Sequence, residues 1–237
     1  MTHTPRTPSP DQLKQQAADA ALGYVESGMV VGLGSGSTAK LFIEGLGRLL
    51  AGGELRDVRG IPTSEESDRL ARRAGVPITT FADVGQCDLT VDGADEIDPK
   101  LNLIKGLGGA LLREKIVAQN SRRRVTIADA GKLVDRLGSK APLPVEVIPF
   151  GAERLPAFFR ALGGEPVLRT QRDSAAPYRT DNGNLIFDVR FGPIADPAGL
   201  EGTLLRRAGV VGTGLFLGMA DEVIVAHADR LQTIARA

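Results

Sequence analysis

The chain has 237 residues, of which 42% are hydrophobic and 24% charged, as in soluble globular proteins with one large domain or one domain and a smaller companion. The number of lysines and arginines equals the number of aspartates and glutamates, at 29 each. This charge balance excludes a dedicated nucleic-acid or membrane-surface binder and favours a small-molecule ligand. Cys87 is the single cysteine, so the chain cannot form an internal disulfide. It has two histidines, His3 and His227, which are too few for a histidine-based zinc site and argue against a Ser-His-Asp triad. Catalysis must therefore use carboxylates and lysines, and a reducing cytoplasm is the expected location.

The chain begins with a stretch that has no apolar run. Residues 1–10 contain three prolines and three threonines, which predicts a disordered tail rather than a signal peptide or a membrane anchor. From Asp11 apolar residues return at helical spacing, so a first helix is expected there. A short strand over 29–31 and a glycine turn over 32–38 follow, and helical spacing then resumes at Ala39.

Strands and helices continue to alternate up to about residue 138. Helices are predicted over 64–74 and 110–119, and strands over 58–61, 77–80, 89–91 and 125–128. This alternation is typical of an α/β fold with a doubly wound, Rossmann-like, mostly parallel sheet. Ligands of such sheets bind beyond the carboxyl ends of the strands.

A second unit is predicted over 139–212, where the order of elements changes after Ala141-Pro142-Leu143-Pro144. Strands over 145–148, 166–170, 185–191 and 210–215, with helices over 153–162 and 197–208, give a βαββαβ order. That order suggests a smaller ferredoxin-like α+β domain inserted in the larger one, which would comprise residues 11–138 and 213–237. The apolar run 223–226 would return the chain to the first sheet.

The first polar cluster is the glycine turn, where Ser35, Gly36, Ser37 and Thr38 lead into a helix. Backbone N–H groups at a helix N-terminus together with hydroxyl donors form an anion site, and phosphate is the obvious guest. The turn lacks the third glycine of a dinucleotide fingerprint and the lysine of a P-loop. The turn therefore predicts anion binding but does not indicate which reaction the protein catalyses.

The second cluster follows the strand over 89–91, where Asp92, Gly93, Ala94 and Asp95 precede two further acids. The spacing does not fit an EF-hand, while a magnesium site and a solvated acidic turn both stay open. Asp92 and Asp95 are nearest the strand end, so they are expected to face a ligand.

Two more clusters carry cations. Lys105, Gly106, Leu107 and Gly108 form a second glycine turn ahead of a helix that carries Glu114, and Lys132 follows the strand over 125–128, three residues after Asp129. A solvent-exposed helix surface is the alternative for Glu114. Four strand-end segments would thus direct hydroxyls, carboxylates and lysines toward one side of the sheet.

In this order and spacing the motifs identify the chain as resembling the type A ribose-5-phosphate isomerases, from about Asp11 to His227. The resemblance rests on Gly34-Ser35-Gly36-Ser37-Thr38-Ala39, Asp92-Gly93-Ala94-Asp95-Glu96-Ile97, Lys105 with its glycine turn, Arg113-Glu114-Lys115, Asp129 with Lys132, and Gly214-Leu215-Phe216. The sequence departs from the family pattern at Leu107, where a glycine is common, at Ser35, where threonine is frequent, and at Gly212-Thr213.

The resemblance implies an aldose-ketose isomerase of the non-oxidative pentose phosphate pathway, acting through an enediolate without metal or other cofactor. Glu114 would be the general base, Asp92 the ring-opening group, and Lys105 the cation that stabilises the enediolate. Substrate contacts would come from Asp92 to Asp95, Lys105 to Gly108, Ser35 to Thr38 and Lys132, the last two sets chiefly at the phosphate, with Lys14 a weaker candidate. The family also implies a homodimer or homotetramer.

Two rival functions follow from the same motifs. Another sugar-phosphate isomerase or deaminase on a related fold would share the phosphate turn. A sugar-phosphate sensor would share the binding site, but residues 1–10 leave no room for a DNA-binding helix-turn-helix and a sensor has no use for Glu114.

Overall fold

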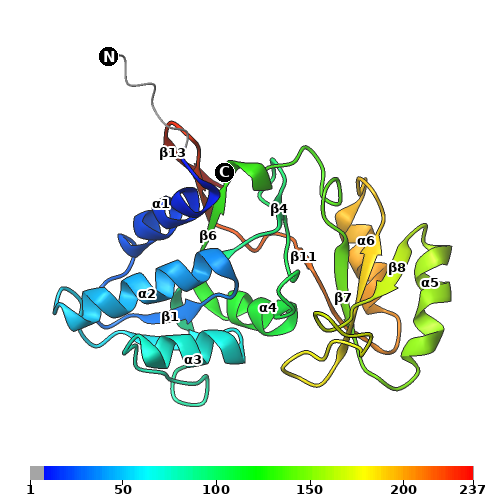
Figure 1. Cartoon of the computed structure of the whole chain (residues 1–237), viewed down its shortest axis with the longest axis horizontal. Helices are drawn as coiled ribbons and strands as arrows, with labels where there is room; N and C mark the ends of the chain where they lie inside the picture. Colours follow the sequence, from blue (N-terminus) through cyan, green and yellow to red (C-terminus); the bar gives the residue numbers. More distant parts are fainter. Residues whose placement is uncertain (1–7, 237) are drawn as a thin grey trace.

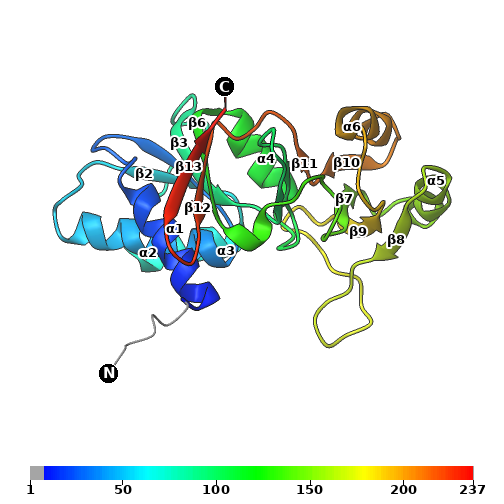
Figure 2. The same ribbon diagram turned by 90° about the horizontal axis from the view of Figure 1, so that it is seen from above.

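The computed structural model of the chain describes residues 8–236 and consists of two units that lie end to end (Figures 1 and 2). Residues 1–7 of the predicted tail lie outside the described residues. The prediction was wrong for residues 9 and 10, because Ser9 caps helix α1 (Pro10–Leu22) by accepting a hydrogen bond from the Gln12 N–H, and Pro10 is its first residue.

The larger unit is built on a six-stranded sheet in the order β13-β12-β6-β3-β1-β2. Neighbouring strands are parallel except β13, which runs antiparallel to β12. The strands are β1 (Val30–Leu33), β2 (Arg59–Pro62), β3 (Cys87–Gly93), β6 (Ser121–Asp129), β12 (Glu222–Ala226) and β13 (Leu231–Ala235). The predicted α/β fold class with a mostly parallel sheet is confirmed.

Successive side chains of a strand point to opposite faces of this sheet, and helices cover both faces. Val31 and Leu33 pack in one core with Phe42 of α2 (Ser37–Ala51). Helix α1 lies beside α2, and α3 (Glu65–Arg73) contacts both α2 and β2. Val30 packs on the other face with Val117 of α4 (Leu111–Gln119). Helix α4 also contacts the second unit, so it lies between the two (Figure 1).

The second unit is a four-stranded antiparallel sheet in the order β10-β7-β9-β8. Its elements follow the predicted βαββαβ order: β7 (Leu143–Val147), α5 (Leu155–Ala161), β8 (Glu165–Leu168), β9 (Leu185–Arg190), α6 (Pro197–Leu205) and β10 (Val210–Thr213). A separate core around Phe159 and Phe187 supports it. The boundaries 11–138 with 213–237, and 139–212, stay a prediction.

A three-stranded sheet of β4 (Glu96–Ile97), β5 (Leu103–Ile104) and β11 (Leu215–Phe216) lies between the units. The predicted strand 210–215 is therefore divided at Gly214 between two sheets. The backbone of Lys105 passes so close that a Cβ on Gly214 would lie 2.3 Å from the Lys105 carbonyl oxygen. Because only glycine fits such an approach, the crossing depends on this residue.

One predicted strand is absent, and β4, β5 and β13 were not predicted. Residues 77–80 form no strand, since Ile78 makes only an isolated bridge to Gly60. Strand β13 was not predicted, because its residues are mostly exposed and show no apolar alternation. Within residues 8–236 no helix is long and apolar enough to cross a membrane.

Two helical glycines give a matched test of this packing. Gly47→Ala in α2 is expected to lower the free energy of unfolding by about 1–3 kcal/mol, because its Cβ would lie 2.3 Å from the backbone oxygen of Ala74. Gly202→Ala in α6 meets no atom closer than 3.5 Å and is expected to raise it by about 0.5–1 kcal/mol. Urea denaturation of both variants measures the two changes, and equal signs would contradict the packing described.

Candidate active site

A cavity of about 200 Å³ opens at the carboxyl ends of the central strands. Its walls come from the four polar segments and α1: Lys14, Ser35, Gly36, Ser37, Thr38, Gly93, Ala94, Asp95, Lys105, Gly106, Gly108, Glu114, Asp129 and Lys132. The structure therefore brings the predicted site residues together, except that Asp92 and Leu107 do not line the cavity. Asp129, which had been given no role, also lines the cavity.

Lys105 is the centre of the site. Its Nζ atom lies 3.1 Å from Oδ2 of Asp92 and 3.4 Å from Oε2 of Glu114, and it donates a hydrogen bond of 2.6 Å to the Gly93 carbonyl. The side chain is 6% exposed. Burial by itself lowers the pKa of a lysine, but Asp92, Glu114 and Asp95 outweigh it and raise the pKa of Lys105 above its usual value. Lys105 is therefore a fixed cation.

Glu114 lies in the first turn of α4 and is 5% exposed, so the alternative of an exposed helix surface is wrong. Its Oε2 atom has the ion-pair contact with Lys105 but no hydrogen-bond partner among the described residues. Burial raises the pKa of Glu114 to about 8; Lys105 opposes the rise, while Asp92 and Asp95 add to it. The arrangement gives a carboxyl group that exchanges a proton near neutral pH.

Asp92, near the end of β3, contacts both the first glycine turn and Lys105. Its Oδ1 atom accepts the N–H groups of Ser35 at 3.1 Å and Gly93 at 2.7 Å, and its Oδ2 atom faces Lys105. Burial raises the pKa of Asp92 against the lowering effects of Lys105 and of both N–H donors. Asp92 thus ties the first glycine turn to the lysine.

Asp95 is held by the second glycine turn, because its Oδ2 atom accepts the Leu107 N–H at 3.0 Å. The turn needs glycine at its two ends, since Gly106 and Gly109 have φ of +102° and +89°. Leu107 has no positive φ, so its backbone does not require glycine, and the residue is 43% exposed, so its side chain has room. Leucine is therefore accommodated at a position where the family often has glycine.

The other end of the cavity is suited to an anion. Helix α2 begins at Ser37, and no side chain caps its N-terminus, because Gly36 at the cap position has φ of +89° and offers none. The Ser35 hydroxyl is 2.8 Å from the hydroxyls of both Thr63 and Ser64, which sequence reasoning missed as supports of the turn. Uncapped N–H groups with Lys14 and Lys132 nearby form a ready anion site.

The two remaining acids of the second cluster serve the fold. Glu96 is fully buried and accepts backbone N–H groups of Gly138, Lys140 and Ala141. Asp98 closes the turn to β5 by accepting the N–H groups of Lys100 and Asn102. In the part of the chain that the structure describes, no three His, Cys, Asp or Glu side chains are grouped as metal ligands.

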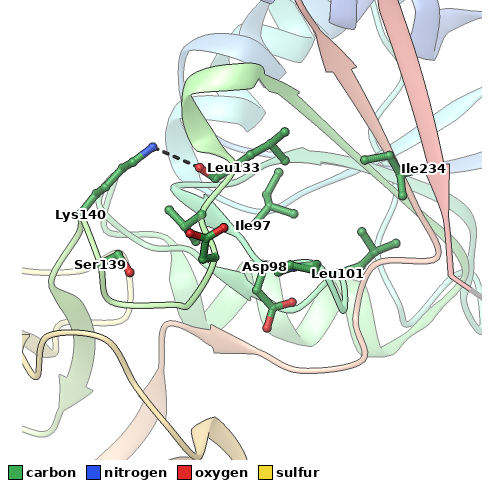
Figure 3. A pocket seen from close by; sticks show the side chains of 10 residues that line it. Ile97, Asp98, Leu101, Leu133, Ser139, Lys140 and Ile234 are labelled. Carbon is green, nitrogen blue, oxygen red and sulfur yellow. Dashed lines mark hydrogen bonds between the residues drawn. The ribbon is translucent and has the colours of Figure 1, made fainter.

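A larger cavity of about 520 Å³ lies beside β4 and β13, lined by Ile97, Leu101, Leu133 and Ile234 (Figure 3). Two of its charged groups are engaged by the fold: Lys140 donates to the carbonyls of Gly131 and Leu133, and Asp98 closes its turn. No buried acid or base faces it. The smaller cavity, whose charged groups converge, is therefore the candidate active site.

Comparison with known proteins shows the family of the chain. The model of the family Ribose 5-phosphate isomerase A (phosphoriboisomerase A) matches residues 59–230. The ribose-5-phosphate isomerase A of Roseiflexus castenholzii is 54% identical over 91% of this chain and 92% of that protein, and that of Desulfatibacillum aliphaticivorans is 48% identical over 97% and 99%.

Solved structures give the same result. A D-ribose-5-phosphate isomerase in complex with phospho-erythronic acid superposes with a TM-score of 0.94 at 40% identity, over 97% of this chain and 100% of that one. The ribose 5-phosphate isomerase A of Methanocaldococcus jannaschii gives 0.91 at 42% identity, over 96% and 100%. The chain therefore belongs to the ribose-5-phosphate isomerase A family.

Proposed function

We propose that the chain interconverts ribose 5-phosphate and ribulose 5-phosphate through an enediolate, with Glu114 as the general base. The observation that carries this proposal is the buried Glu114 carboxyl group, 3.4 Å from the Lys105 ammonium, in a cavity whose other end is an uncapped helix N-terminus. One end provides a base and a cation, and the other an anchor for a phosphate.

The reaction needs one carboxylate and one cation. Ionised Glu114 takes the proton from C2 of the open-chain aldose, and the electron pair moves onto the carbonyl oxygen at C1 to give the enediolate. A hydroxyl proton passes from O2 to O1, and protonated Glu114 returns its proton to C1, which gives the ketose. Lys105 stabilises the oxygen charge that develops, while the N-terminus of α2 with Lys14 and Lys132 holds the phosphate.

The buried environment makes Glu114 a stronger base than an ordinary carboxylate. A base whose pKa lies near the working pH combines a useful ionised fraction with a larger driving force for proton transfer. The raised pKa of Glu114, about 8, meets this condition. The phospho-erythronic acid bound by the related isomerase carries a carboxylate where an enediolate has its two oxygens, which suits a site built for that intermediate.

Ring opening has two candidate carboxylates. The family resemblance assigns the step to Asp92, which contacts Lys105 but does not line the cavity. Asp95 lines the cavity and is oriented by the Leu107 N–H. We keep Asp92 as the proposal, because its Oδ2 atom lies 3.1 Å from the Lys105 ammonium, and we take Asp95 as the group that orients the sugar.

Glu114→Gln is expected to lower kcat by about 10²- to 10⁴-fold, because the amide cannot accept the C2 proton. Binding of a phosphorylated aldonic acid should change little, since the volume of the side chain is preserved. Ketose formation and solvent deuterium incorporation, followed by NMR in D₂O, measure the loss directly.

The matched control for this change is Glu44→Gln on α2, whose carboxylate is paired only with Lys40 at 3.9 Å. The control should keep wild-type kcat and wild-type deuterium incorporation. A Glu114→Gln enzyme with kcat within threefold of wild type would remove Glu114 from the mechanism.

The ring-opening proposal is tested with a substrate that has no ring to open. A four-carbon aldose 4-phosphate cannot close a five-membered ring through its phosphorylated oxygen. Asp92→Asn should therefore lose at least about tenfold more kcat on ribose 5-phosphate than on the four-carbon substrate. Equal losses on both substrates would give Asp92 a purely structural or electrostatic role, and the same selective loss in Asp95→Asn alone would move the step to Asp95.

A further inference from the structure

The second unit reaches into the site through one arginine. Arg169 follows β8, and its Nη1 atom donates hydrogen bonds to the carbonyl oxygens of Gly106 at 3.0 Å and Leu107 at 3.1 Å. These two carbonyls belong to the glycine turn that follows Lys105. Tyr178 lies against the same turn, because a Cβ on Gly109 would fall 2.2 Å from its hydroxyl oxygen.

The Arg169 side chain is itself fixed. Asp188 on β9 accepts hydrogen bonds from both Nε, at 2.9 Å, and Nη2 of the guanidinium. The guanidinium carbon also lies 5.8 Å from the ring centre of Tyr178. Only 12% of the Arg169 side chain is exposed. A planar guanidinium held on two sides and largely withdrawn from water directs its remaining N–H groups with little freedom.

The two hydrogen bonds from Arg169 to the Gly106 and Leu107 carbonyls also determine where the N–H groups of the same two peptides point. No peptide bond in residues 8–236 is cis, so the N–H of each of these peptides is directed away from its carbonyl. The Gly106 carbonyl is bound to Arg169, and the N–H of the same peptide, on Leu107, donates to Asp95 inside the cavity at 3.0 Å.

The next peptide follows the same rule. The Leu107 carbonyl is bound to Arg169, and the N–H of that peptide belongs to Gly108, which lines the cavity. Among the hydrogen bonds of the described residues the Gly108 N–H has no acceptor. It is therefore an oriented donor available to a ligand.

We propose that Arg169 is a positioning residue of the isomerase: held by Asp188, it fixes two successive peptides so that the Leu107 N–H orients Asp95 and the Gly108 N–H is aimed at the reacting end of the sugar. The role of the Gly108 N–H toward the sugar rests on the proposed function. The claim that Arg169 fixes the glycine turn does not.

The test uses three variants of the full chain. Arg169→Met removes both carbonyl contacts at similar length, and Arg169→Lys retains a donor without the fork that Asp188 holds. Arg123→Met is the matched control, because Arg123 also pairs with a carboxylate, Glu222, and stacks on a tyrosine, Tyr24, but lies away from the cavity. Each variant is assayed for kcat and KM on ribose 5-phosphate, for thermal unfolding, and for amide hydrogen exchange in residues 105–109.

Arg169→Met is expected to lose about 10- to 100-fold in kcat, the usual effect of a displaced transition-state donor, with a smaller change in KM. Arg169→Lys should recover part of the loss. Both should exchange the amides of residues 105–109 faster than wild type, and Arg123→Met should show neither change. The melting temperature of Arg169→Lys separates these effects from general unfolding.

Unchanged exchange in residues 105–109, or a kcat within twofold of wild type in both Arg169 variants, would overturn the proposal. Should wild type itself fail to isomerise ribose 5-phosphate, the proposed function falls, and faster exchange in the Arg169 variants alone would still support the control of the turn by Arg169.

Discussion

The site depends on the burial of one ammonium group among three oxygen acceptors. Lys105 is almost withdrawn from water and faces Asp92, Glu114 and the Gly93 carbonyl within 3.4 Å. A lysine in such a place is stable only while the carboxylates compensate for its lost hydration, and removing one partner leaves an uncompensated buried charge. The same burial disfavours ionised Glu114, and Asp92 and Asp95, which help to keep the lysine charged, add to the rise of the Glu114 pKa.

The rest of the fold brings distant segments to this ammonium group. Parallel strands β1, β3 and β6 end on one side of the sheet and deliver the first glycine turn, Asp92 and Asp129. Helix α4 between the two units presents Glu114, and β5 leads into the turn after Lys105. The second unit has its own core and contributes Arg169 and Tyr178 to the back of that turn. Both units are therefore needed to define the geometry of the site.

Much of this arrangement could be predicted from the sequence, because its signals are local. Alternating apolar runs indicated the parallel sheet, and polar residues directly after strands indicated the end where a ligand binds. The burial of Glu114 could not be predicted, since neighbouring apolar residues on α4 are compatible with an exposed carboxylate and only the packing of two units decides it. Long-range contacts explain the other misses: Thr63 and Ser64 act through Ser35, and the division of the strand predicted over 210–215 occurs at Gly214, where the Lys105 backbone passes close by. Strand β13 was not predicted, because an exposed edge strand needs no apolar alternation in its sequence.

The central claim is that a buried carboxyl group with a raised pKa transfers the proton. The most direct test is the dependence of kcat/KM for ribose 5-phosphate on pH from about 5 to 9.5, which reports the ionisation of the free enzyme. Because the base must be ionised, kcat/KM is predicted to rise with pH and to level off above an apparent pKa near 8, the value that burial gives Glu114. A profile that is already level from about pH 6.5 upward, where only the second ionisation of the phosphate near pH 6 limits the rate, would contradict it.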